Sequence, residues 1–213
     1  MLLKKISETN MEQVLRHAVD ALKNGSIIAY PTETFYGLGT KFDMEDSLKR
    51  LYDIKQRPKE KPMPLIIGNN KLLSVVAVNV NQIALSFIDK FWPGPLTLIL
   101  PAKKNLSEYI TAGTGKVAVR IPGESFALSL AKTADFPISA TSANLSGMPP
   151  AQDTEAVIRY FGDKIDLIFD SGSSTGGLPS TIVDVIGDEI NILREGAISR
   201  ESIKIFLNTL DFL

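Results

Sequence analysis

Two short polar segments of this sequence could together hold a nucleotide. Lys55-Gln-Arg57 carries two cations, and Ser142-Ala-Asn144 carries a hydroxyl and a carboxamide, in each case two residues apart. In an extended chain, side chains at this spacing point to the same side, so each segment can present two polar groups to one ligand. Cations attract phosphate, while hydroxyl and amide groups hydrogen-bond the oxygens of phosphate or ribose. The two segments therefore predict a phosphate and nucleotide site.

Both segments also have an ordinary structural explanation. Every second residue from Lys55 to Lys61 is Lys or Arg, and such charge runs are usually solvated faces. Pro58 interrupts the run and restricts the backbone, which favours a rigid display of cations toward an anion. Ser142 and Asn144 could equally belong to an ordinary loop network. The residues alone leave these alternatives open.

Two further positions could bind a small polar substrate. Pro31-Thr-Glu-Thr34 follows an apolar strand, where ligand sites of open α/β sheets gather. Its hydroxyls could contact a ligand or satisfy the backbone of a turn. Arg120 ends the apolar run Val117-Ala-Val-Arg-Ile121, and its guanidinium could bind a carboxylate through two bonds or pair with an internal acid.

The composition excludes several classes of chemistry. The sequence contains no cysteine, so thiol nucleophiles, disulfides and thiolate metal sites are absent. Its one histidine, His17, lies on the flank of a helical pattern, so serine hydrolase triads and sites with several histidines lack their parts. The net charge of -1 gives no global basic footprint, although a local basic groove remains possible. Positioning and electrostatics are the chemistry that remains.

The N-terminus and the hydrophobic pattern indicate a cytoplasmic protein. The segment Met1-Leu-Leu-Lys-Lys5 is followed at once by polar residues, so the apolar stretch is too short for a signal peptide. No apolar run has the length of a membrane span. We therefore expect a soluble chain with no membrane contact.

Hydrophobic periodicity predicts alternating helices and strands. Helices are expected at residues 11–23, from an N-cap at Asp43 to about residue 57, and at 70–77, 80–91, 124–134, 153–161 and 199–208. Strands are expected at 26–30, 64–67, 96–100, 117–121, 137–141, 166–170, 181–186 and 190–194. A loop is expected through Gly37 and Gly39. This order predicts an α/β fold with a mixed sheet, and the lack of a long linker predicts one domain over residues 1–213.

Seven segments carry a more specific signal when they are considered in chain order. They are Pro31-Thr-Glu-Thr-Phe-Tyr-Gly-Leu-Gly39, Lys55-Gln-Arg-Pro58, Trp92-Pro-Gly-Pro-Leu-Thr97, Val119-Arg-Ile-Pro122, Ala140-Thr-Ser-Ala-Asn-Leu-Ser-Gly147, Pro179-Ser-Thr-Ile-Val-Asp184 and Leu193-Arg-Glu-Gly196. Over about residues 8–200, the chain thereby resembles the YrdC-like family of threonylcarbamoyl-AMP synthases. The resemblance implies a twisted, open sheet of parallel and antiparallel strands, flanked by helices around a concave, positively charged cleft.

The resemblance also implies an activity and a set of site residues. It implies a nucleotidyltransferase that makes threonylcarbamoyl-AMP and pyrophosphate from L-threonine, bicarbonate and ATP, for the threonylcarbamoyladenosine modification of tRNA. Lys55 and Arg57 would be catalytic. ATP would be bound by Lys55, Arg57, Lys61, Ser142, Asn144 and Arg194, and threonine by Thr32, Thr34, Arg120 and Ser180. Mg²⁺ would accompany ATP, the sequence identifies no dedicated set of protein ligands for it, and no tightly bound cofactor is expected.

Two features differ from the fullest form of the family pattern. Some members have a histidine where this chain has Gly68, so that substrate contact cannot be transferred. The chain resembles the short, single-domain form, which works with other tRNA-modifying proteins.

The segment Ser171-Gly-Ser-Ser-Thr-Gly-Gly177 could be a mobile loop over a site or a solvated connection. An alternative function is an RNA-binding protein that uses the same cations on an RNA backbone without adenylate synthesis.

Overall fold

The strands form two separate hydrogen-bonded sheets within residues 1–174, 176–187 and 190–210, which the computed structural model describes. The first sheet has the order β1-β9-β2-β3-β8, made of Leu2–Lys5, Leu167–Asp170, Ile28–Pro31, Tyr36–Gly39 and Thr141–Ser142. The second has the order β11-β10-β5-β6-β4-β7, made of Asn191–Arg194, Thr181–Asp184, Leu96–Pro101, Lys116–Arg120, Leu65–Ile66 and Ile138–Ser139. Each sheet combines parallel and antiparallel pairs, which confirms the predicted mixed α/β fold.

Several of the helices begin at a polar side chain that caps them. The helices are α1 Met11–Lys23, α2 Glu45–Lys55, α3 Leu73–Val76, α4 Gln82–Phe91, α5 Glu108–Thr111, α6 Phe126–Ala134, α7 Thr154–Phe161 and α8 Arg200–Asn208, with 3-10 turns at Asn70–Leu72 and Gly162–Lys164. The side chains of Asn81, Ser125 and Asp153 accept backbone N–H groups at the starts of α4, α6 and α7. These caps agree with the ends predicted from the sequence.

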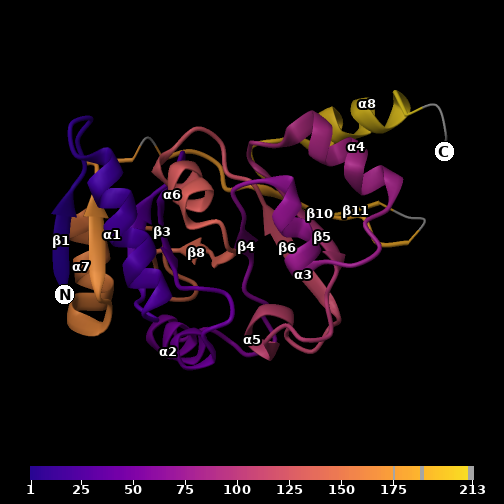
Figure 1. The fold of residues 1–213 in the computed structure, drawn as a ribbon. Helices are drawn as coiled ribbons and strands as arrows, with labels where there is room; N and C mark the ends of the chain where they lie inside the picture. Colours follow the sequence, from indigo (N-terminus) through magenta and orange to yellow (C-terminus); the bar gives the residue numbers. More distant parts are fainter. Residues whose placement is uncertain (175, 188–189, 211–213) are drawn as a thin grey trace.

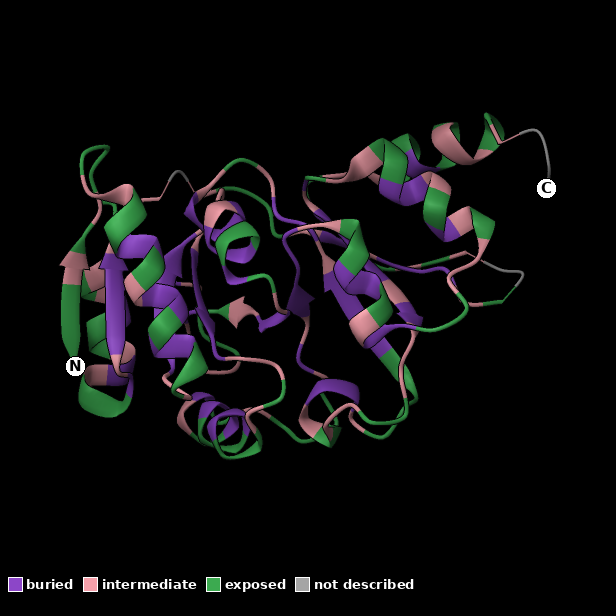
Figure 2. Cartoon of the chain, in the orientation of Figure 1, coloured by how far each residue is buried: buried purple, intermediate pink, exposed green. Residues whose placement is uncertain are grey.

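The helices cover the sheets and bury two apolar clusters. Figure 1 shows the sheets side by side, with α1 in front of the first sheet and with α4 and α8 together beside the second. α1 and α6 pack against each other and against β2, forming the smaller cluster. The larger cluster includes Leu38 from the first sheet and Leu98 from the second, so it joins both sheets. Figure 2 shows buried residues along the inner strands and exposed residues on the outer faces of the helices.

The segment from residue 138 to 142 crosses from one sheet to the other. β7 pairs with β4 in the second sheet, whereas β8 pairs with β3 in the first. The predicted single strand at 137–141 was therefore wrong, because the chain changes partners at Ala140, whose N–H bonds to the carbonyl of Pro64. This crossing sets Ser142 directly beside β3, where it pairs with Gly37.

Three other local predictions were wrong. Residues 36–39 form β3 rather than a loop, and the glycine at position 39 permits close packing, because a Cβ there would lie 2.2 Å from the carbonyl oxygen of Ser139. Asp43 does not cap α2; its carboxylate pairs with Lys41, and the helix begins at Glu45. Lys55-Gln-Arg57 is not extended, since Lys55 ends α2 and Gln56 has a left-handed backbone with φ of 51°. The i, i+2 argument therefore does not apply to this segment.

The sequence patterns did not predict β1 or α5. The positively charged cleft and the organisation as one domain stay predictions. Within the described part of the chain, no helix is long and apolar enough to cross a membrane.

Candidate functional site

Lys55 and the segment from Ser142 to Asn144 form one hydrogen-bonded cluster. Lys55 Nζ donates to the carbonyl oxygen of Ser142 at 2.5 Å and to that of Asn144 at 2.7 Å. The Ser142 hydroxyl donates to Asn144 Oδ1 at 2.5 Å, so these two side chains do lie together, as their spacing predicted. The structure thus brings together the two tripeptides first singled out in the sequence.

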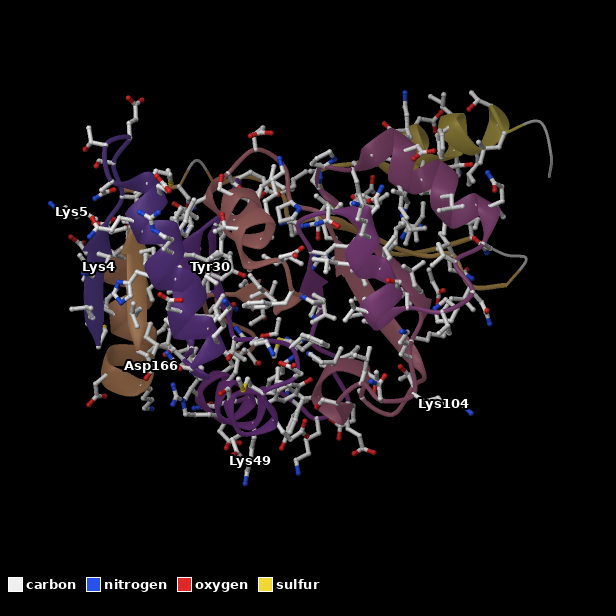
Figure 3. The ribbon with its side chains drawn as sticks, viewed as in Figure 1. Lys4, Lys5, Tyr30, Lys49, Lys104 and Asp166 are labelled. Carbon is white, nitrogen blue, oxygen red and sulfur yellow. The ribbon has the colours of Figure 1, made fainter. Side chains whose placement is uncertain are left out.

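Lys55 differs from an ordinary lysine in its burial. Its relative exposure is 1%, whereas Lys49 on the same helix is exposed and projects outward in Figure 3. Burial, and then the nearby charge of Arg57, lower the pKa of Lys55 from 10.5 to about 7. The solvated-face explanation is therefore wrong for Lys55, which lies beneath the polar segment it contacts.

Arg57 is held by the loop that follows it. Its Nε donates to the carbonyl oxygen of Lys61 at 3.0 Å and its Nη2 to that of Pro62 at 2.7 Å. The guanidinium also lies 5.9 Å from the ring centroid of Tyr52. Arg57 is half-buried and fixed in orientation, whereas Lys61 is exposed. The turn after Lys55 therefore presents a preorganised guanidinium close to the Lys55 ammonium.

The hydroxyl of Thr32 closes the turn between β2 and β3. Thr32 Oγ1 donates to the carbonyl oxygen of Phe35 at 2.7 Å and accepts the N–H of Thr34 at 3.2 Å. This is the turn explanation that the sequence left open for Thr32. Thr34 Oγ1 lies 3.3 Å from Thr32 Oγ1, and both threonines are half-buried. Thr34 thus keeps more freedom to contact a ligand than Thr32 does.

Arg120 pairs with Glu33, the residue between these two threonines. Arg120 Nη1 lies 2.8 Å from Glu33 Oε1, and the two side chains are 13% and 18% exposed. Tyr30 is buried, and its hydroxyl has no hydrogen-bond partner among the described residues. Burial raises the pKa of Tyr30, which the charge of Arg120 lowers and that of Glu33 raises. Figure 3 shows Tyr30 inside the molecule, behind α1. Because β6 carries Arg120 and the β2–β3 turn carries Glu33, the ion pair links the two sheets.

Arg194 and Ser180 hydrogen-bond to each other, and Arg194 lies near Arg120. Arg194 Nε and Nη2 donate to the carbonyl oxygen of Ser180 at 3.1 and 2.8 Å, and Nη2 also lies 3.1 Å from Ser180 Oγ. The Ser180 hydroxyl is 2.9 Å from that of Thr97 on β5. A shift in the β10–β11 register next to Arg194 is a bulge, a feature that re-aims side chains near functional sites. Burial and the nearby Arg120 lower the pKa of Arg194.

These contacts divide the predicted site residues into two groups. Lys55, Arg57, Ser142 and Asn144 form the first. Arg120, Arg194 and Ser180, together with the Thr32–Thr34 turn, form the second. Two contributors were missed in the sequence, Glu33 and Thr97, although each lies inside a segment singled out for its motif. Glu33 is the internal acid that was one of the alternatives for Arg120.

The segment from Ser171 to Gly177 lies beside the second group. The N–H of Gly176 donates to the carbonyl oxygen of Thr34 at 2.9 Å. The Ser174 hydroxyl donates to the carbonyl oxygen of Gln152 at 2.9 Å. Thr175, in the middle of this segment, lies outside the described residues. These two hydrogen bonds hold the segment to the Thr32–Thr34 turn and to Gln152, and its role as a mobile loop over the site stays a prediction.

Gly68 has a packing reason of its own. It is buried, and an added Cβ would lie 2.4 Å from the carbonyl oxygen of Ala131 on α6. A histidine at this position would require α6 to move away. The close approach of α6 therefore explains why a glycine stands at position 68.

Among the described residues, neither a metal cluster nor the 550 Å³ hollow beside α3 marks the predicted site. Among the residues that the structure describes, no group of three or more Asp, Glu or His side chains is placed to hold a metal ion. A hollow of about 550 Å³ lies by α3 and the start of α4, and no predicted site residue lines it. The candidate site rests on its hydrogen bonds and charges instead.

Comparisons with known proteins confirm the family resemblance. The family model for Sua5, YciO and YrdC, described as "Telomere recombination", matches residues 20–196. The threonylcarbamoyl-AMP synthase of Pyrococcus abyssi is 36% identical over 93% of this chain and 58% of its own length. That of Bacillus subtilis is 37% identical over 92% of this chain and 57% of its own length, so this chain spans under two-thirds of both relatives. The Vibrio parahaemolyticus enzyme is 36% identical over 88% of this chain and 99% of its own length.

Solved structures show the same fold. Pyrococcus abyssi Sua5 complexed with L-threonine has a TM-score of 0.92 and 35% identity, covering 97% of this chain and 61% of that chain. Escherichia coli YciO has a TM-score of 0.81 and 25% identity, covering 92% of this chain and 95% of that chain.

Proposed function

Since this chain belongs to the Sua5/YciO/YrdC family, we propose that it makes threonylcarbamoyl-AMP and pyrophosphate from L-threonine, bicarbonate and ATP. The observation that carries the proposal is the buried Lys55, hydrogen-bonded to the backbone of Ser142 and Asn144 with Arg57 close by. This cluster combines the basic groups of Lys55 and Arg57 with a hydroxyl and an amide, the donors that a triphosphate and its ribose require.

The reaction needs positioning and charge neutralisation from the protein. The threonine amine and bicarbonate combine to a carbamate with loss of water. A carbamate oxygen then bonds to the α-phosphorus of ATP, and the bond from that phosphorus to the pyrophosphate oxygen breaks. Lys55, Arg57 and Lys61 would neutralise the charge that develops on the leaving pyrophosphate. No protein nucleophile takes part, in keeping with the lack of cysteine.

The second group would hold threonine. Arg120 would take its carboxylate, with Thr34 and Ser180 near its other polar groups and Arg194 toward the nucleotide. Support comes from the relative Pyrococcus abyssi Sua5, which was solved with L-threonine. Mg²⁺ would arrive bound to ATP, and no step of this proposal depends on a metal held by the protein. The product would pass to other proteins that modify tRNA, in the cytoplasm.

The test is pyrophosphate release by the purified chain. Release from ATP should require both L-threonine and bicarbonate. An equal rate without threonine would refute the proposal, and salt-sensitive RNA binding with no release would favour the RNA-binding alternative. Arg120→Gln should raise the KM for threonine by roughly 10- to 100-fold while the KM for ATP stays near that of the wild type, because one charged hydrogen-bonding partner is lost.

A further inference from the structure

We infer that Glu33 binds the ammonium group of threonine, and that the Glu33–Arg120 ion pair opens to admit the substrate as a zwitterion. The inference rests on the proposed function and assigns a specificity role to a residue outside the predicted set. Its starting point is the 2.8 Å contact between Arg120 Nη1 and Glu33 Oε1.

The burial of the pair sets the electrostatic requirement. Both side chains are mostly buried, so breaking this ion pair would cost both charges its stabilisation in a poorly solvated place. If threonine brought only its carboxylate to Arg120, Glu33 would lose its ion pair with Arg120. The nearby Arg194 cannot replace that cation easily, because its side chain is held on Ser180 by three contacts.

An α-amino acid satisfies both charges at once. Its carboxylate can replace Glu33 on Arg120, while its ammonium replaces Arg120 on Glu33. The inserted ligand is neutral overall, so the net charge of the site does not change and each charged group keeps a partner. The ion pair therefore occupies the same two half-sites that a bound zwitterion would use.

Small residues lie on one side of Glu33. Gly123 lies beside the Glu33 side chain, since a Cβ added at Gly123 would lie 3.9 Å from Glu33 Cγ. That Cβ would also lie 3.8 Å from Gly94 Cα, so two glycines line this flank. Thr32 and Thr34, which are both predicted to contact threonine, are the neighbours of Glu33 in the chain.

The exchange predicts selectivity for a ligand that carries both charges. In calorimetric titrations, wild-type protein should bind L-threonine at least tenfold more tightly than 3-hydroxybutanoate, which lacks the ammonium, or L-threoninol, which lacks the carboxylate. Glu33→Gln should weaken threonine binding by roughly 10- to 100-fold and raise the KM for threonine without raising the KM for ATP. Binding of 3-hydroxybutanoate should stay unchanged or improve, because its carboxylate no longer competes with Glu33 for Arg120.

Controls separate this role from a structural one. Glu8→Gln removes the same charge from an exposed residue before α1 and should keep the wild-type ratio of threonine to 3-hydroxybutanoate affinity. If Glu33→Gln lowers the affinity for both ligands by one factor, or for neither, the role of Glu33 is wrong. Should that variant fail to fold, the wild-type series decides alone, since equal binding of either analogue overturns the inference. Wild-type protein that binds no threonine and releases no pyrophosphate would refute the proposed function itself.

Discussion

Replacing Lys55 by Met should remove a pH dependence of stability that the buried amine creates. Met keeps a chain of similar length, so it deletes the amine without opening a large cavity. The amine bonds to two carbonyl oxygens, at 2.5 and 2.7 Å, and a neutral amine with two N–H groups can satisfy both. The charged form is the one that burial disfavours.

The sign and size of this pH dependence follow from the pKa values of Lys55 in the folded and the unfolded protein. The folded protein loses the proton near pH 7, while the unfolded chain keeps it up to about 10.5. Between these values the unfolded state binds more protons, so the free energy of unfolding rises with pH. The slope is at most about 1.4 kcal/mol per pH unit, which makes a rise of up to about 2.8 kcal/mol over two pH units. The carbonyl contacts favour the ammonium and bring the observed rise below this ceiling.

Urea unfolding of wild type and Lys55→Met at pH 7.5, 8.5 and 9.5 measures the effect, with Trp92, the single tryptophan, as the fluorescent probe. The difference in unfolding free energy between the two proteins should grow in favour of wild type across this series. Lys49→Met, which changes an exposed lysine of the same helix, should show no such growth. A difference that stays constant with pH, or the same growth in both variants, would refute the assignment of a depressed pKa to Lys55.

The other predictions concern rate and packing. Arg57→Ala should lower turnover in the pyrophosphate assay by roughly 10²- to 10³-fold, because a hydrogen-bond donor to the charge that develops in the transition state is lost. An unchanged rate in a folded variant would show that Arg57 belongs to a solvated surface instead. Gly39→Ala should lower the free energy of unfolding by about 1–3 kcal/mol, because its Cβ would meet the Ser139 carbonyl at 2.2 Å. Gly123→Ala, whose Cβ would meet nothing nearer than 3.8 Å, should stay within about 0.5 kcal/mol of wild type, and equal losses in chemical denaturation would contradict the packing argument. Thr181→Val should cost about 1–3 kcal/mol by the same measurement, since the buried hydroxyl accepts two backbone N–H groups.

Local patterns predicted the helices well. α1 was expected from the periodic apolar residues Val14, Leu15, Ala18, Val19 and Leu22, and all five are buried in it. Such periodicity arises within one helix, so it needs no knowledge of the partner elements. β3 could not be found in this way, because its glycines resemble a loop, and the need for Gly39 appears only against the backbone of Ser139.

The sequence by itself determined the family motifs and most of the residues proposed for the site. It could not determine which of them meet, because those contacts depend on strand pairing. Lys55 reaches Ser142 and Asn144 across 87 and 89 residues, through a crossing at Ala140 that local spacing does not encode. The tertiary structure alone also decided that Lys55 is buried, that Arg120 faces Glu33, and that Arg194 rests on Ser180. Burial and charge pairing are properties of the packed chain, and they turn a run of cations into groups with separate roles.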